Sequence, residues 1–183
     1  MSLLYPGQYR ARFAAVTSCL HPEERSVLEL CFGDVILARY CLNSNRRWTG
    51  FDINDSFVRH AKKLGFDAYC VDILNKLELP SSDVCIMMGS LYHFHENLPF
   101  IFRNILTATP RLLLMEPVEN FSSRPGVIGA LARLSASVGK GDEAFRFTRT
   151  SLTDRMDELS RQLGFSWRII SAQGRQILLE IHR

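Results

Sequence analysis

One short segment constrains the fold more than any other part of the sequence, the run Val27–Asp34 (VLELCFGD). Its apolar residues and following glycine predict a buried strand and a tight turn, and the helically spaced apolar residues over 35–42 predict a helix directly afterwards. The next predicted strand, 47–52, ends at Asp52. A strand, a glycine turn, a helix and then an acid at the following strand end is the arrangement with which α/β folds bind a nucleoside.

The middle of the chain continues this alternation of strands and helices. Further elements are predicted as follows: helices over 8–20, 55–64 and 97–107, and strands over 67–71, 83–88 and 111–116. Such an order predicts a parallel sheet with right-handed crossovers. Asp55 with Ser56 is the predicted N-cap of the helix over 55–64, and Gly65 is its predicted stop.

The C-terminal third departs from this rhythm. Residues 118–150 form a longer predicted insertion or lid region, in which 127–138 has helical spacing. The remaining predicted elements are a helix over 151–163, with Ser151 or Thr153 as its cap, and strands over 165–172 and 175–182. The Gln173-Gly174 pair between the two strands predicts an antiparallel hairpin at the end of the sheet.

Length and cysteine usage limit the class of protein. The 183 residues, of which 46% are hydrophobic, fit a single domain over 1–183 with a core large enough to fold without disulfides or metal. The five cysteines are scattered without a C-x-x-C pair, which is typical of buried residues in a reducing compartment. We therefore expect a cytoplasmic protein without a metal site.

Charge and hydropathy point to no membrane or nucleic-acid partner. No signal-peptide pattern is present, and no apolar run approaches the roughly 20 residues that span a bilayer. The net charge of +3 is small, and the basic residues are dispersed instead of gathered into one stripe. The oligomeric state is left open by the sequence.

The order of these elements resembles the class I S-adenosylmethionine-dependent methyltransferase family over residues 8–183. The resemblance implies a Rossmann-like, doubly wound sheet of seven strands, mostly parallel, with a C-terminal antiparallel hairpin. Val27–Val35 is similar to the glycine motif of the family. Gly33 stands at the central glycine, while Cys31 and Val35 occupy the positions of the other two.

The resemblance rests on four local matches at the carboxyl ends of successive predicted strands, Val27–Val35, Gly50–Ile53, Cys70–Ile73 and Met88–Phe94. It implies that Asp52 binds both ribose hydroxyls and that Asp72 binds the adenine amino group. The implied contacts with S-adenosyl-L-methionine are Glu29, Cys31, Gly33, Asp52, Ile53, Asp72, Ile73 and Gly89. A carboxylate suits a ribose because its two oxygens accept from two adjacent donors.

The segment Met88–Phe94 is similar to the part of small-molecule methyltransferases that follows the fourth strand. It lacks the acid or asparagine, two prolines and aromatic residue of nucleic-acid amino methyltransferases, so a small-molecule acceptor is favoured. A hydroxyl acceptor needs a base, and a histidine titrates near neutral pH. His93 is the first candidate, with His95 and Tyr92 after it.

Other interpretations of the same residues stay open at this point. Asp52 is also compatible with capping the helix that begins at Asp55, Asp72 with a turn, and the histidines with packing or solvation. Replacement of two glycines is compatible with a degenerate methyltransferase fold that binds a cofactor or partner without turnover. A nicotinamide-dependent oxidoreductase is the remaining alternative, although Ile36 stands where its third motif glycine is expected.

Overall fold

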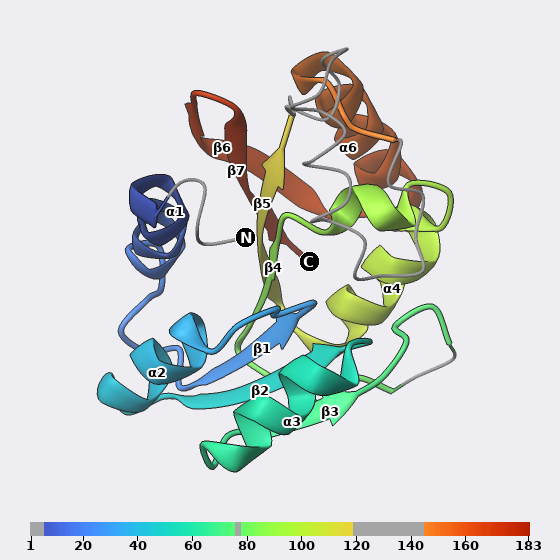
Figure 1. The fold of residues 1–183 in the computed structure, drawn as a ribbon. Helices are drawn as coiled ribbons and strands as arrows, with labels where there is room; N and C mark the ends of the chain where they lie inside the picture. Colours follow the sequence, from blue (N-terminus) through green and yellow to red (C-terminus); the bar gives the residue numbers. More distant parts are fainter. Residues whose placement is uncertain (1–5, 76–77, 119–144) are drawn as a thin grey trace.

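A computed structural model of the chain describes residues 6–75, 78–118 and 145–183 (Figure 1). Strands and helices alternate through most of it. The strands are β1 (Ser26–Leu30), β2 (Arg47–Asp52), β3 (Asp67–Cys70), β4 (Val84–Met88), β5 (Arg111–Pro117), β6 (Ser166–Gln173) and β7 (Gln176–His182). The helices are α1 (Pro6–Thr17), α2 (Ile36–Asn43), α3 (Asp55–Lys63), the short 3-10 helix η1 (Leu91–Phe94), α4 (Leu98–Ala108) and α6 (Arg149–Leu163).

The described strands form one seven-stranded sheet in the order β3-β2-β1-β4-β5-β7-β6. Strands β1 to β5 pair in parallel, whereas β7 pairs antiparallel with both β5 and β6. The predicted seven-stranded sheet with a C-terminal antiparallel hairpin is confirmed. Strand order reverses between β1 and β4, and ligands of open α/β sheets bind outside the carboxyl ends of the strands at such a switch point.

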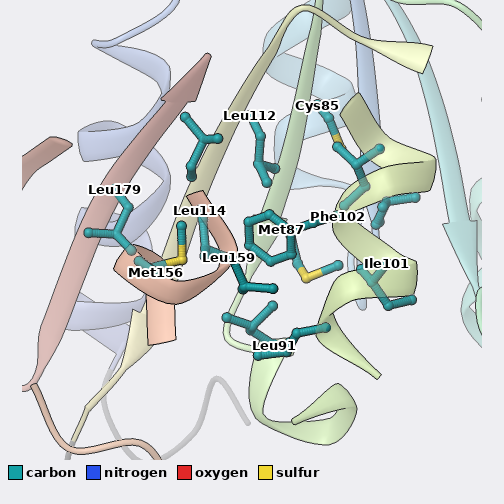
Figure 2. Packing of buried hydrophobic residues seen from close by; sticks show 14 of the residues in the cluster. Cys85, Met87, Leu91, Ile101, Phe102, Leu112, Leu114, Met156, Leu159 and Leu179 are labelled. Atoms are coloured by element: carbon teal, nitrogen blue, oxygen red, sulfur yellow. The ribbon is translucent and has the colours of Figure 1, made fainter. Parts of the chain in front are cut away.

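Alternating apolar residues in the strands divide the core into two layers. On one face, Val84 and Ile86 of β4 belong to a cluster with side chains of α1, α2 and α3. On the other face, Cys85 and Met87 pack with α4 and α6. Figure 2 shows this second layer, with the labelled side chains of β4, β5 and β7 directed at those of the two helices. Helices on both faces explain why the central strands β4 and β5 are buried along nearly their whole length.

Two helix caps lie outside the positions that the sequence predicts. Asn54, not Asp55, is the N-cap of α3, and its side chain accepts the N–H of Ser56. Helix α6 begins at Arg149, and Thr148 caps it in a capping box with Ser151. The predicted caps were wrong because several neighbouring residues in each segment have capping side chains, and the choice among them depends on where the chain enters the helix.

Boundaries at two other places also differ from the prediction. Helix α1 ends at Thr17, because the hydroxyls of Thr17 and Ser18 bond to carbonyls three residues earlier and the chain turns there. The predicted insertion over 118–150 loses both ends: Val118 donates its N–H to Arg175 beside the hairpin, and residues 149–150 belong to α6. The predicted helical spacing over 127–138 lies outside the described residues. In the described ranges, every helix is too short or too polar to cross a bilayer.

Candidate active site

The turn after β1 keeps a glycine-like backbone although cysteine replaces the first motif glycine. Cys31 has φ of 56° and Gly33 has φ of 62°, both in the left-handed region. Val35 has φ of −101°, which any residue adopts. Of the two substituted glycine positions, only position 31 therefore carries a conformational cost, typically about 1–2 kcal/mol for a residue with a Cβ.

Hydrogen bonds hold this turn against β2. The N–H of Cys31 donates to the carbonyl of Phe51 over 2.7 Å, and the N–H of Gly33 donates to Asp52 Oδ2 over 3.0 Å. Burial raises the pKa of the Cys31 thiol, and the charge of Asp52 acts in the same direction. The thiol is therefore protonated at neutral pH and is not poised as a nucleophile.

Asp52 stands at the carboxyl end of β2 and is only 7% exposed. Its Oδ2 accepts the N–H of Gly33, and its Oδ1 accepts the N–H of Asn54 over 2.8 Å. Burial raises the pKa of Asp52, although these backbone hydrogen bonds oppose the shift. Because Asn54 is the cap of α3, the alternative in which Asp52 caps that helix is wrong. Each carboxylate oxygen has a second lone pair that can accept from a hydroxyl.

Glu29 lies deeper than the other predicted cofactor contacts. It is buried in β1, and its Oε2 accepts the indole N–H of Trp48 over 2.8 Å. Burial raises the pKa of Glu29 well above its usual range, while the hydrogen bond from Trp48 works against the shift. Gly50 leaves room for this indole ring, since a Cβ there would lie 2.1 Å from it. Glu29 thus joins β1 to β2 beneath the turn.

The residues that follow β2 and β3 differ in how they face solvent. Ile53 is 42% exposed, whereas Ile73 is 7% exposed and packs in the core. Asp72 is half-buried, and its Oδ1 accepts the N–H of Leu74 over 3.0 Å. Ile53 and Asp72 are therefore open to a ligand at the strand ends, and Ile73 supports them from below.

The segment after β4 carries the predicted catalytic residues. Gly89 has φ of 67°, and its N–H donates to the carbonyl of Met115. Tyr92 is buried, and the ring of His93 lies 4.0 Å from that of Tyr92, measured between centroids. His95 instead stacks on Phe145, with ring centroids 4.0 Å apart and planes 8° apart.

His93 has the properties of a neutral base. Burial lowers the pKa of His93, and the positive charge of Arg146 lowers it further. Its Nδ1 is buried and has no hydrogen-bond partner within residues 6–75, 78–118 and 145–183. The neutral imidazole is the form that can accept a proton.

A buried carboxylate in this region is absent from the residues predicted from the sequence. Glu116, the last residue but one of β5, has 0% exposure, and its two oxygens accept the N–H groups of Leu91 and Tyr92, each over 3.1 Å. Burial raises the pKa of Glu116 to about 8, although both hydrogen bonds and the charges of Arg12 and Arg146 oppose the shift. An acid that directly follows the apolar run Leu112–Met115 is a signal from which this residue could have been found.

Two arginines were also missed. Arg12 of α1 places its Nη2 2.8 Å from the point that a Cβ on Gly89 would occupy. Arg146 lies over the ring of Tyr92, with 3.7 Å between the guanidinium carbon and the ring centroid. Both come from segments far from Met88–Phe94 in sequence, and no local pattern connects them.

Similarity to known proteins is visible in structure and not in sequence. No protein-family profile matches the chain. A search of curated sequences also gives no match.

Solved structures similar to this one include several methyltransferases. A complex of DhpI with SAM and HEP has a TM-score of 0.70 and 13% identity, covering 100% of this chain and 89% of that one. An S-adenosylmethionine-dependent methyltransferase from Mesorhizobium loti has a TM-score of 0.72 and 16% identity, covering 94% and 98%. Magnesium protoporphyrin IX methyltransferase (ChlM) from Synechocystis PCC 6803 with bound SAH has a TM-score of 0.65 and 14% identity, covering 96% and 81%.

These similarities establish the fold. The matches cover nearly the whole of this chain, so it shares the fold of these methyltransferases. Site chemistry and substrate then have to be argued from this chain's own residues, because a fold hosts many functions.

Proposed function

We propose that this protein is an S-adenosylmethionine-dependent methyltransferase with a small-molecule acceptor. The observation that carries the proposal is the link between Asp52 and Gly33, in which the carboxylate at the end of β2 accepts the N–H of the β1 turn. This link fixes a carboxylate beside a turn of left-handed backbone at the switch point of the sheet. The carboxylate is placed to bind the ribose of the cofactor, and the turn allows another part of the same ligand to lie close to the backbone.

The residues proposed to bind the cofactor lie at the carboxyl ends of the strands. Asp52 would accept the ribose hydroxyls with its remaining lone pairs, and Ile53 and Asp72 would contact the adenine ring and its amino group. The backbone of the turn after β1 would lie beside the amino acid part of the cofactor. Supporting contacts are assigned to Glu29, Cys31, Gly33, Ile73 and Gly89. The fit rests on the left-handed φ of Cys31, which preserves the glycine-like path of the turn.

In this reaction the protein contributes mainly binding and orientation. When bound, the cofactor supplies an electrophilic methyl group on a sulfonium. The residues of the chain have to hold an acceptor in line with that group and keep water out. For a hydroxyl acceptor, His93 takes the proton, since it is neutral and its Nδ1 is uncommitted to other described residues. Tyr92 and His95 are proposed to frame the acceptor.

Two considerations support a small acceptor. The segment Met88–Phe94 lacks the residues with which nucleic-acid amino methyltransferases hold an extruded base. Among the similar structures, ChlM is named for a small molecule, magnesium protoporphyrin IX.

One alternative is favoured by a specific observation. Cys31 occupies a left-handed position with a side chain that the glycine motif lacks, which narrows the space beside the turn. A protein that binds the cofactor without turnover would tolerate this. Tight binding of S-adenosylhomocysteine together with failure to methylate any acceptor in a broad panel would favour this alternative.

Calorimetric titration with S-adenosylmethionine and S-adenosylhomocysteine tests the proposal directly. We expect both to bind, and Asp52→Ala to weaken binding by about 1.5–3 kcal/mol, the scale of hydrogen bonds to a charged group. Asp55→Ala removes an exposed carboxylate of the next helix and serves as the matched control. Absence of binding by the unmodified protein, or a response to a nicotinamide dinucleotide instead, would overturn the methyltransferase assignment.

A further inference from the structure

Two guanidinium groups from distant parts of the chain converge at the carboxyl ends of β4 and β5. Arg12 reaches there from α1, where it lies against Gly89. Arg146 reaches there from the segment before α6, where it lies over the ring of Tyr92. The charges of both act on Glu116, and the charge of Arg146 acts on His93. Both arginines therefore border the place where the acceptor has to lie for His93 to reach it.

How deeply Glu116 and the two arginines are buried determines which of them an acceptor can contact. Glu116 is fully buried, and both of its oxygens are already bonded to backbone N–H groups of η1. The two arginine side chains are only half-buried. The carboxyl group is thus withdrawn into the protein, while the two cations lie nearer the surface, and Arg146 is close enough to His93 for its charge to lower the pKa of that imidazole.

Electrostatics then favours one class of acceptor. A bound sulfonium would bring a third positive charge to these strand ends. An amine cation would be repelled by all three charges, whereas an oxyanion would be attracted to them. Guanidinium groups bind carboxylates and phosphates through paired N–H donors, and the contact with the Tyr92 ring restricts where the Arg146 guanidinium lies before any ligand arrives.

We propose that the methyl acceptor is a small organic acid whose carboxylate or phosphate-type oxyanion is bound by Arg12 and Arg146. The inference rests on the proposed function and narrows its acceptor class. Arg12 and Arg146 are binding residues in it, and His93 keeps its role as the base for a hydroxyl acceptor.

Anion titrations of the full chain test the inference without a known substrate. The probes are benzoate and inorganic phosphate as oxyanions, benzyl alcohol as a neutral compound and benzylamine as a cation. Binding is followed by NMR chemical-shift changes and by thermal stability, with and without saturating S-adenosylhomocysteine. We expect benzoate or phosphate to bind and benzylamine not to bind. Which of the two binds more tightly then separates a carboxylic acid from a phosphate ester.

Arginine variants locate the binding. Arg12→Gln and Arg146→Gln should each weaken the oxyanion by about tenfold or more, the fold-change expected for one charge-assisted hydrogen bond, while S-adenosylhomocysteine affinity stays within twofold. Arg10→Gln and Arg149→Gln, which remove exposed arginines close in sequence to Arg12 and Arg146, should leave oxyanion binding unchanged. If Arg146→Gln reduces stability through the lost contact with Tyr92, Arg146→Lys keeps the charge and should give an intermediate affinity.

Several results would overturn the inference. The arginines do not form the site if the oxyanion affinity is unchanged in Arg12→Gln and Arg146→Gln. The same holds if the Arg10→Gln and Arg149→Gln controls reduce that affinity equally. Equal binding of benzylamine and benzoate, or no oxyanion binding at all, would do the same. If S-adenosylhomocysteine does not bind, the proposed function fails, and the titrations of the cofactor-free protein still decide whether the arginines form an oxyanion site.

Discussion

Cys31 holds a left-handed backbone at the position where the family motif has glycine. For most residues in helices and strands, alanine is more stable than glycine by about 0.5–1 kcal/mol because glycine loses more entropy on folding. At position 31 the cost of the Cβ, about 1–2 kcal/mol, outweighs that entropy. The conformation is therefore retained against the local preference of the residue, as is common where backbone geometry serves a ligand.

A pair of substitutions tests this strain. Cys31→Gly is expected to be more stable than Cys31→Ala by about 0.5–1 kcal/mol, since both lose the thiol and only glycine relieves the positive φ. At Cys41, which lies within α2, the order should be the usual one for a helix, with alanine the more stable. Urea unfolding of the four variants gives both differences. The same order of glycine and alanine at the two positions would contradict a strained Cys31.

The state of His93 can be measured without any acceptor. Burial lowers the pKa of His93, and the charge of Arg146 adds to the effect. Removing a neighbouring positive charge favours the imidazolium form, so Arg146→Gln should raise the pKa of His93 in an NMR titration. Arg149→Gln, which removes an exposed arginine at the start of α6, is the control and should leave the titration unchanged. A titration unaffected by Arg146→Gln would show that the guanidinium does not act on the ring.

At the scale of elements, Glu116 connects the end of β5 to the start of η1. The two N–H groups that it accepts, from Leu91 and Tyr92, come directly before His93. A 3-10 helix of four residues has few hydrogen bonds of its own, so this carboxylate is a main constraint on where His93 lies. The positioning depends on strand pairing between β4 and β5, which places the two strand ends side by side.

The pH dependence of stability should report Glu116. Burial raises its pKa from 4.5 to about 8 in the folded protein. A raised pKa means that the folded state binds the proton more tightly. The stabilising contribution is then full below about pH 4.5 and is lost as the pH rises through about 8. The free energy of unfolding of the unmodified protein should therefore fall relative to that of Glu116→Gln over this interval.

Urea unfolding at several pH values measures this difference. Glu96→Gln removes an exposed carboxylate just after η1 and is the control for losing an acid from the same region. A constant difference between Glu116→Gln and the unmodified protein across the interval would mean that Glu116 does not change protonation there.

Local sequence patterns were sufficient for the sheet but not for the whole site. Asp52, Asp72 and Gly89 each follow an apolar run directly, so the pattern that predicts a strand also locates the residue at its end. Arg12 and Arg146 have no such neighbour in sequence, and only the packing of α1 and of the segment before α6 brings them to the ends of β4 and β5. The prediction of the helix caps failed for a different reason, because adjacent residues in each segment have capping side chains.

For the whole molecule, one buried arginine ties the N-terminal segment to the terminal hairpin. Arg111, the first residue of β5, donates to Glu24 and to Glu180, each over 2.7 Å, and to the carbonyl of Cys19 over 2.8 Å. Burial opposes ionisation of Glu180, yet hydrogen bonds from Arg168 and Arg111 outweigh it and lower its pKa to about 2. The network fixes the linker that follows α1, and the position of Arg12 depends on that linker.

Replacing this arginine should therefore affect the fold and the site together. Arg111→Met leaves the buried Glu24 without its cation and Glu180 with Arg168 alone, and we expect a loss of about 3–5 kcal/mol in the free energy of unfolding at neutral pH. Arg168→Met provides the control, because Arg168 also bonds Glu180 but its side chain is 72% exposed. Glu180 keeps its ion pair with Arg111 in this variant, so no buried carboxylate loses its last cation and the control should cost far less.

Restoring neutrality separates a buried charge from simple loss of packing. If the loss comes from uncompensated carboxylates, Arg111→Met combined with Glu24→Gln and Glu180→Gln should recover part of the stability, because no buried charge then lacks a partner. If packing alone were responsible, the combined variant would be no more stable than Arg111→Met. Equal costs for Arg111→Met and Arg168→Met in urea unfolding would contradict the network's role in joining α1 to the hairpin.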